Sequence, residues 1–151
     1  MESSEYNRLI KLLKRPDNDH LYLPKDGEQE MYKIHAILNS SENFKSYVSR
    51  THHKKRKKIS LVINSNKYGY MMRFDIIGAP HNDVPTPHLH IFNKGQDFRN
   101  QTFLSYNQLP KEIKPDLNHL DEIDNIIDNF TNFLEYNNVD LKDVIISPII
   151  C

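Results

Sequence analysis

The sequence predicts an α+β fold, with an antiparallel β-sheet (meander) packed by an N-terminal helix and a long C-terminal amphipathic helix. Apolar residues recur at helical spacing near the N-terminus, alternate with polar residues through the middle, and step by three and four in the last third. Each of these spacings of apolar residues is typical of a helix or strand that buries one face. The 151 residues suffice for one core but hardly for two, which predicts a single domain over residues 1–151.

The first element is predicted to be a helix. Tyr6, Leu9, Ile10 and Leu13 recur at helical spacing, and Pro16 is expected to end the helix. Residues 16–28 are rich in proline, aspartate, asparagine and glycine, which favours loop structure around a short apolar stretch. That stretch, residues 21–23, is interpreted as a linker or a short edge strand.

The middle of the chain is predicted to form the strands of the meander. Alternation marks residues 31–38, 59–64, 68–77 and 88–92 as strands with one buried face. Turn residues at 64–67 predict a hairpin between two of them. Residues 44–53 alternate less cleanly, so this run is interpreted as either a strand or a short helix opening at Ser40 or Ser41.

In the last third of the chain, the spacing of apolar residues predicts a long amphipathic helix that begins near Asn118. Its apolar stripe steps by three and four from Leu120 to Leu134, and acidic and amide residues occupy the opposite side. The tail from Val144 to Ile150 is unusually apolar for a chain end. We expect it either to pack on the body of the protein or to contact a protein partner.

Charge and cysteine content narrow the functional classes. The formal net charge is zero, so any attraction to nucleic acid must be local. The single cysteine, Cys151, excludes an intrachain disulfide. No apolar run approaches the length of a signal peptide core or a membrane span, which predicts a cytoplasmic location without membrane partners.

Residues 73–90 carry the strongest indication of a functional site. If the strands around residues 73 and 90 pair, strand parity places Arg73, Asp75, His88 and His90 on one polar face, with His81 in the loop between them. Imidazoles, a carboxylate and a guanidinium together suit acid–base chemistry on a phosphate, or a metal site. A solvated sheet face without function gives the same alternation, and that alternative stays open.

The spacing of the histidines and carboxylates in residues 73–90 fits some known site patterns and not others. A His-x-His strand with a nearby carboxylate satisfies the ligand count of a zinc or iron site. The glutamate that a cupin has shortly after the second histidine is missing, as are the two His-x-Thr or His-x-Ser repeats of two-histidine phosphoesterases.

A basic run precedes this segment and is the candidate nucleic-acid-binding region. Local positive potential is high there although the whole chain is neutral, which suits contact with phosphate. A solvated turn between two strands is the alternative. The residues are Arg50, His52, His53, Lys54, Lys55, Arg56, Lys57 and Lys58.

The motif Arg73-Phe-Asp-Ile-Ile-Gly78, then His81 and Pro87-His-Leu-His-Ile-Phe92, resembles an uncharacterised family of small proteins from Gram-positive bacteria and their phages. The resemblance covers the middle of the chain and extends weakly to residues 133–136. A more distant similarity is to TumE-type toxins of toxin–antitoxin pairs, which place an Arg-x-Asp strand before a histidine-rich, proline-containing segment. Those toxins are thought to act on RNA, so the resemblance implies a prophage-encoded, toxin-like role.

Three functional hypotheses remain open from the sequence. The first is an RNA-binding or RNA-cleaving protein that needs no metal or cofactor. In its mechanism His88 or His90 takes the 2′-hydroxyl proton and His81 protonates the leaving oxygen. Arg73 and residues 54–58 hold the phosphate, and Asp75 orients an imidazole. The second is a non-enzymatic interaction protein of a phage or mobile element. The third is a zinc or iron hydrolase.

Overall fold

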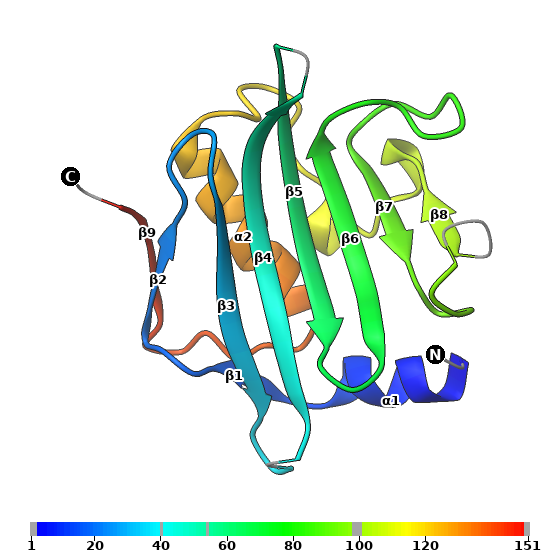
Figure 1. Cartoon of the computed structure of the whole chain (residues 1–151), viewed down its shortest axis with the longest axis vertical. Helices are drawn as coiled ribbons and strands as arrows, with labels where there is room; N and C mark the ends of the chain where they lie inside the picture. The colour runs from blue at the N-terminus through cyan, green and yellow to red at the C-terminus, as the bar shows by residue number, and fades with distance from the viewer. Residues whose placement is uncertain (1–2, 40, 54, 98–100, 150–151) are drawn as a thin grey trace.

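The computed structural model describes residues 3–39, 41–53, 55–97 and 101–149, except for the side chain of His53. It confirms the α+β class. Seven strands form one antiparallel sheet in the order β1-β3-β4-β5-β6-β7-β8, so consecutive strands from β3 onward are neighbours, as a meander requires (Figure 1). The bounds are β1 Lys14–Pro16, β3 Gln29–Ala36, β4 Asn43–His53, β5 Arg56–Ser65, β6 Gly69–Ile77, β7 His88–Ile91 and β8 Thr102–Leu104.

A second, two-stranded sheet lies beside the first. It pairs β2, His20–Leu23, in parallel with β9, Ile145–Pro148. The short apolar stretch near the N-terminus is therefore a strand, and its partner comes from the C-terminal tail. In Figure 1 the two strands lie together at the side of the main sheet next to β3.

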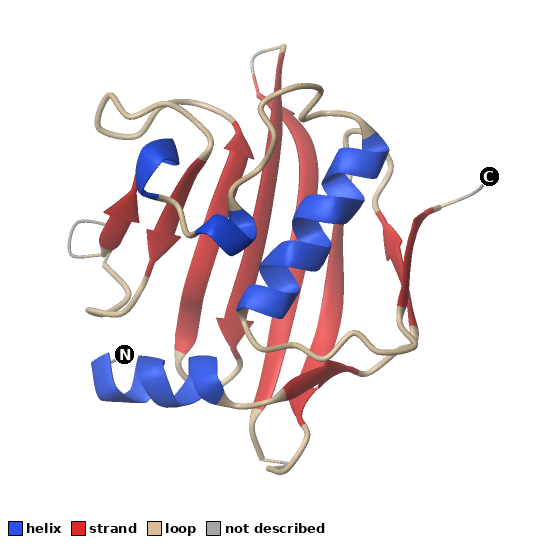
Figure 2. Cartoon of the chain, turned by 180° about the vertical axis from the view of Figure 1, so that it is seen from behind, coloured by secondary structure: helices blue, strands red, loops and turns tan. Residues whose placement is uncertain are grey.

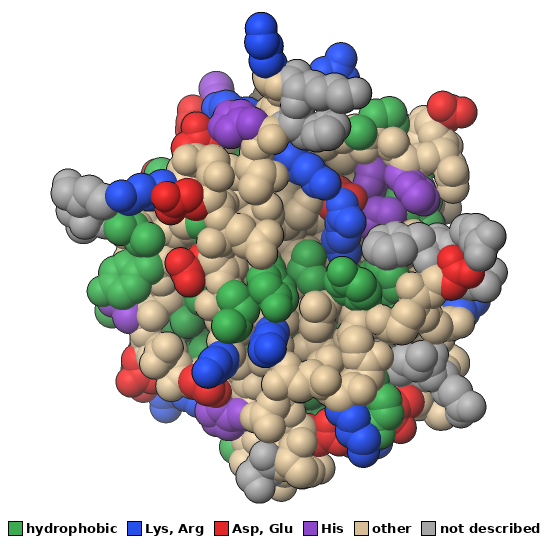
Figure 3. Space-filling view, in the orientation of Figure 1, with side chains coloured by type: hydrophobic (Ala, Val, Ile, Leu, Met, Phe, Trp, Pro, Cys, Tyr) green, Lys and Arg blue, Asp and Glu red, His purple; other side chains and the backbone are tan. Residues whose placement is uncertain are grey.

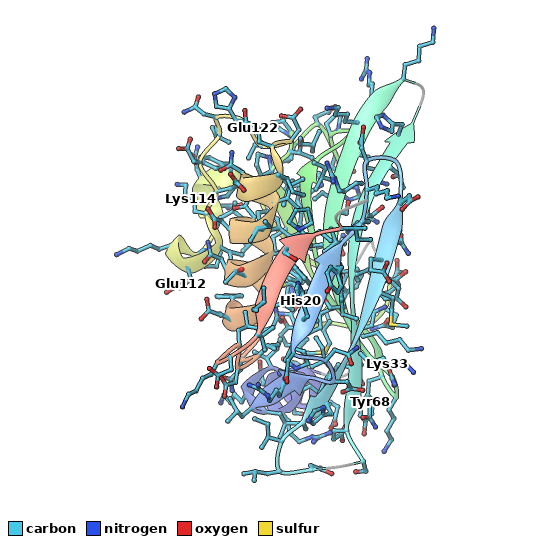
Figure 4. The ribbon with its side chains drawn as sticks, turned by 90° about the vertical axis from the view of Figure 1, so that its left-hand side faces the viewer. His20, Lys33, Tyr68, Glu112, Lys114 and Glu122 are labelled. Atoms are coloured by element: carbon cyan, nitrogen blue, oxygen red, sulfur yellow. The ribbon has the colours of Figure 1, made fainter. Side chains whose placement is uncertain are left out.

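The helices cover one face of the large sheet. Helix α2, Ile123–Tyr136, crosses that face, and α1, Ser3–Lys11, lies across one end of the strands (Figure 2). Two short 3₁₀ helices, η1 Tyr106–Gln108 and η2 Lys111–Ile113, lie on the same side. Figure 4, seen along the sheet edge, separates the helical layer, where Glu112 and Lys114 lie, from the strands.

Two predicted helix boundaries were wrong, and one open alternative is decided. Helix α1 ends at Lys11 rather than near Pro16, and residues 14–16 form the edge strand β1, whose outer edge tolerates a proline. Helix α2 begins at Ile123 rather than near Asn118, because His119 has a left-handed backbone (φ 58°) that no helix can contain. For the run 44–53 the sequence allowed a strand or a short helix, and the structure has the strand, β4. Ser40, one of the two residues expected to open the helix, lies outside the described residues.

The hydrophobic core lies between the sheet and the helical layer. Leu61 and Phe74 from the sheet and Ile126, Phe130 and Phe133 from α2 are fully buried. Residues that pair directly across an antiparallel sheet point to the same face, so the alternate positions of β3 to β7 face away from the helices. That second face, which we call the open face, is the one turned to the viewer in Figures 1 and 3.

No helix among the described residues combines the length and the apolar character that crossing a bilayer would require.

Candidate functional site

Strand pairing brings the predicted polar residues together on the open face. Asp75 pairs with His88, and Arg73 pairs with His90, in the antiparallel register of β6 and β7. The pairing of β6 with β7, on which the prediction depended, is therefore present. Histidine side chains gather over this end of the sheet in Figure 3, next to lysine or arginine side chains.

The carboxylate of Asp75 is the centre of the group and is 5% exposed. Its Oδ2 atom lies 2.9 Å from Nε2 of His88 and 3.1 Å from Nε2 of His90. Its Oδ1 atom accepts hydrogen bonds from Nε of Arg73 at 2.7 Å and from the hydroxyl of Ser60 at 2.8 Å. Four donors thus compensate for the burial of one negative charge.

Opposing influences act on the pKa of Asp75. Burial raises it, whereas the hydrogen bonds from His88 and His90 and the positive charge of Arg73 lower it. The donors prevail and hold the pKa well below the usual range of an aspartate. Asp75 is therefore a carboxylate at neutral pH, available as an acceptor or as a ligand.

The two buried imidazoles are each held at their second nitrogen as well. Nδ1 of His88 lies 3.3 Å from the carbonyl oxygens of both Val84 and Pro85. Nδ1 of His90 lies 2.6 Å from the side-chain amide nitrogen of Gln101. Since both nitrogens of each ring have partners, neither ring offers an unused nitrogen to a substrate in this arrangement.

His81 approaches the same group from the loop between β6 and β7. His81 and Val84 exchange two backbone hydrogen bonds of 2.9 Å, with Asn82 and Asp83 left-handed at the tip, a conformation these two residue types tolerate. The His81 ring centroid lies 5.1 Å from that of His90. Burial, and then the neighbouring His90 and His88, lower the pKa of His81.

Phe103 completes one wall of the histidine group. Phe103 on β8 pairs with His90 on β7. The centroid of its ring lies 4.9 to 5.1 Å from the ring centroids of His81, His88 and His90. An apolar ring in this position strengthens electrostatic interactions among the polar groups because it excludes water.

A cavity of about 200 Å³ opens beside the cluster. Lys58, Arg73 and His81 contribute polar side chains to its wall, around the buried Asp75, His88 and His90. The remaining wall is the segment Gly78, Ala79 and Pro80. Among the described residues, the larger hollows elsewhere, including one lined by residues of α2 and the tail, have at most one histidine each in their walls.

All five residues proposed from the sequence, Arg73, Asp75, His81, His88 and His90, thus line one cavity. Asp83, in the same loop as His81, is exposed at the tip of the turn and does not line the cavity. Sequence reasoning missed three contributors, Ser60, Gln101 and Phe103. Only Ser60 had a signal, as a polar position of the alternating strand 59–64.

The basic run does not form one surface. It is the end of the β4–β5 hairpin, so successive side chains point to opposite faces. His52 and Lys57 are paired with carboxylates, at 3.2 Å from Asp26 and 2.9 Å from Asp121 respectively, and Arg50 donates to the carbonyl of Pro24. Lys55 and Arg56 are exposed and Lys58 lines the cavity, while Lys54 and the side chain of His53 lie outside the described residues.

The apolar tail is partly built into the protein. Its residues 145–148 form β9, and Val144 and Ile146 pack against the core, whereas Ile145 is 59% exposed. Ile150, the last residue of the predicted tail, lies outside the described residues. Packing on the body, one of the two expectations from the sequence, therefore accounts for part of this segment.

Comparison with protein families identifies the chain. A family model described as a family of unknown function, DUF6978, matches residues 1–139. The chain belongs to the DUF6978 family. Neither a curated protein nor a solved structure matches it. Because the match to DUF6978 includes every element from α1 to α2, the whole cavity lies within the family region.

Proposed function

We propose that the protein binds single-stranded RNA and cleaves it at the cavity beside Asp75, in a toxin-like role for a prophage or other mobile element. One observation carries the proposal. Two cationic side chains, Lys58 and Arg73, and the imidazole of His81 line a cavity of about 200 Å³ over a buried Asp–His–His group. Cations that bind phosphate and an imidazole that moves a proton are what cleavage of a phosphodiester requires.

The phosphate of the substrate is proposed to contact Arg73 and Lys58. Arg73 is fixed by its 2.7 Å bond to Asp75, which costs it one donor and leaves the others of its guanidinium available. Lys58 comes from the β4–β5 hairpin, and lysine and arginine side chains extend between that hairpin and the histidines in Figure 3. A strand of RNA lying along this row would meet positive charge before reaching the cavity.

His81 is proposed as the proton acceptor. His88 and His90 are buried, and both of their nitrogens have partners, whereas His81 is only half-buried and projects from the loop. The 2′-oxygen attacks phosphorus as its proton passes to His81, the bond to the 5′-oxygen breaks, and that oxygen is protonated from solvent. The products are a 2′,3′-cyclic phosphate and a 5′-hydroxyl. This assigns His81 a different role from the one that the sequence suggested.

Cleavage of a labelled single-stranded RNA by the purified protein tests the proposal. We expect a product ending in a 2′,3′-cyclic phosphate, and no cleavage of an oligonucleotide with a single deoxyribose at the cut position. His81→Ala should slow the reaction by about 100-fold or more, as loss of a general base does. His35→Ala is the matched control, because His35 also lies beside an aspartate, at 2.7 Å from Asp17, but far from the cavity along β3.

Cleavage of the deoxyribose-containing strand at the normal rate, or full activity in His81→Ala, would refute the proposed chemistry. Failure of the protein to bind or cut RNA under any of these conditions would refute the proposed substrate.

A further inference from the structure

The two buried histidines and Asp75 direct three possible metal-ligand atoms toward a common point. These atoms, Nε2 of His88, Nε2 of His90 and Oδ2 of Asp75, lie within 4.8 Å of one another. Both Nε2 atoms approach the same carboxylate oxygen, at 2.9 and 3.1 Å. All three side chains are buried, so the group is not a chance cluster of surface residues.

The environment of His88 selects the tautomer that a metal ligand needs. The carbonyl oxygens of Val84 and Pro85 can only accept hydrogen bonds, so Nδ1 must carry the proton. A metal ion at Nε2 would take the place of the proton that this nitrogen shares with Asp75, and the ring would then be a neutral imidazole that offers its Nε2 lone pair to the ion. A backbone carbonyl that holds the remote N–H is the usual outer partner of a metal-binding histidine.

Gln101 can hold His90 in the same way. Its amide lies 2.6 Å from Nδ1 of His90, and its Oε1 is buried without a hydrogen-bond partner among the described residues. Rotating the amide by half a turn would place Oε1 against Nδ1, where Oε1 would accept a hydrogen bond from Nδ1–H. A metal ion that replaced the proton between Nε2 of His90 and Asp75 would then meet the Nε2 lone pair.

Asp75 is anchored at the oxygen that does not face the histidines. Arg73 and Ser60 both donate to Oδ1, which leaves Oδ2 directed at the two imidazoles. Outer partners therefore hold Oδ1 of Asp75 and Nδ1 of each histidine. The other atoms, Oδ2 and the two Nε2, face one another. Outer partners hold the ligands of a metal site in this way.

We propose that Oδ2 of Asp75 and Nε2 of His88 and His90 bind one divalent transition-metal ion, with an open coordination position toward the cavity. Two imidazole nitrogens and one carboxylate oxygen suit zinc, iron or cobalt, whereas magnesium and calcium prefer an all-oxygen set. The inference rests on the proposed function in one respect, since it assigns a cofactor to the same cavity. It departs from the metal-free mechanism expected from the sequence.

The geometry needs little change to accept the ion. Ligands about 2.0 to 2.1 Å from a tetrahedral zinc ion are separated from each other by roughly 3.3 Å. The two Nε2 atoms now lie 2.9 and 3.1 Å from Oδ2, so the ion would replace the shared hydrogen bonds with a small outward movement of the rings.

The charge of the site fits an anionic substrate. Asp75 and Arg73 already neutralise each other, so a divalent ion would give the buried group a net charge of about +2, with Lys58 adding one more at the cavity wall. Burying that charge is unfavourable unless an anion compensates for it. A phosphate in the cavity, touching the ion and Arg73, would do so.

Metal titration of the purified, chelator-treated protein tests the proposal. Cobalt(II) added alone should bind with a stoichiometry of one and give the intense visible absorption of a four- or five-coordinate ion, and zinc(II) should displace it. The variants Asp75→Asn and His90→Gln keep the size and polarity of the side chains. Each should weaken cobalt binding by more than the roughly 100-fold that loss of an outer partner costs.

His35→Ala is the matched control, because it removes a histidine from the exposed His35–Asp17 pair. It should leave cobalt binding unchanged. Thermal unfolding adds a readout that does not depend on the spectrum: zinc should raise the melting temperature of the wild type and of His35→Ala, but not that of a folded Asp75→Asn. A variant that does not fold is replaced by Gln101→Leu, which should weaken binding by about 10- to 100-fold.

Absence of stoichiometric cobalt binding by the wild type would overturn the proposal, as would equal loss in His35→Ala. The two proposals fail separately. A protein that cleaves RNA but binds no cobalt would refute the metal site and leave the RNA function standing, whereas a protein that binds cobalt but leaves RNA intact would do the reverse.

Discussion

Asp75 and His88 lie directly opposite each other on β6 and β7, and a 2.9 Å contact joins Oδ2 to Nε2 in the interior of the protein. The same carboxylate also holds His90, Arg73 and Ser60. One side chain therefore connects three strands of the sheet, β5, β6 and β7. The site is part of the structure that stabilises this side of the sheet as well as the proposed place of reaction.

Asp75→Asn should destabilise the metal-free protein strongly. The amide nitrogen would face donors, and the charge of Arg73 would lose its partner in a buried setting. Breaking a buried pair from one side costs about 3 kcal/mol or more. Urea unfolding in the presence of chelator measures the effect. Asp17→Asn is the control, since Asp17 and His35 are both about two-fifths exposed, and should change the unfolding free energy by less than about 0.5 kcal/mol.

Lys14 caps the C-terminal ends of both α-helices. Its buried ammonium donates to the carbonyl oxygens of Ile10 at 3.2 Å and Leu12 at 2.9 Å, where α1 ends, and of Asn137 at 2.8 Å, where α2 ends. It also lies 5.1 Å from the centroid of the Phe44 ring. Burial lowers the pKa of Lys14 to about 7, while the carbonyl oxygens and the ring favour the charged form.

Lys14→Met should therefore be costly although methionine fills similar space. The buried carbonyl oxygen of Asn137 and the part-buried ones of Ile10 and Leu12 would lose this donor, and an unpaired buried group costs about 1 to 3 kcal/mol. We expect a loss of about 3 kcal/mol or more in urea unfolding. Lys11→Met, at an exposed position of α1, should stay within about 0.5 kcal/mol of the wild type. Equal stability of the two variants would show that the carbonyl oxygens find other partners.

The C-terminal strand offers a neighbouring pair of isoleucines with opposite environments. Ile146 packs against the core, while Ile145 is 59% exposed on the other side of β9. Ile146→Ala should lower the unfolding free energy by about 2 kcal/mol, and Ile145→Ala by less than about 0.5 kcal/mol. Deleting residues 144–151 should cost at least as much as Ile146→Ala, because the pairing with β2 is lost as well. An unchanged melting temperature after the deletion would instead support a tail devoted to a partner.

The fold was predictable wherever one period of alternation continued long enough. Strands β3, β5, β6 and β7 turn alternate apolar side chains toward the core, and helix α2 buries one apolar stripe. The alternation of Arg73 and Asp75 with Phe74 also identified the open face. Strands β1, β8 and β9 were missed because three or four residues are too few to establish a period. Pairing of β2 with β9 joins segments more than a hundred positions apart, which no local pattern reports.

Part of the candidate site could be predicted from the sequence, and part could not. Arg73, Asp75, His88 and His90 follow from strand parity, because direct pairing preserves the face. The contribution of Gln101 depends on a loop and a short strand whose course the sequence does not specify. Residues 50–58 do not share one surface for a physical reason: on a strand, neighbouring side chains point to opposite faces. Their role in binding nucleic acid stays a prediction.

That alternation separates Lys58 from Lys57 and gives a sharp test of RNA binding. Lys58 lines the cavity beside Arg73, whereas Lys57 is paired with Asp121 at 2.9 Å on the other face of the hairpin. If the substrate lies over the open face, Lys58 is close to the phosphate and Lys57 is not. Lys58→Ala should then weaken RNA binding and reduce the slope of log affinity against log salt by roughly 0.7, the value expected for one lost phosphate contact on a single strand.

Lys57→Ala should leave both the affinity and the slope unchanged, and because its pair with Asp121 is exposed, it should alter stability by less than about 1 kcal/mol. Fluorescence anisotropy of a labelled single-stranded RNA across a series of salt concentrations measures both quantities. Equal effects of the two substitutions would mean that RNA senses only the general positive potential of the hairpin. A larger effect of Lys57→Ala would place the RNA on the helical side, away from Asp75 and the histidines.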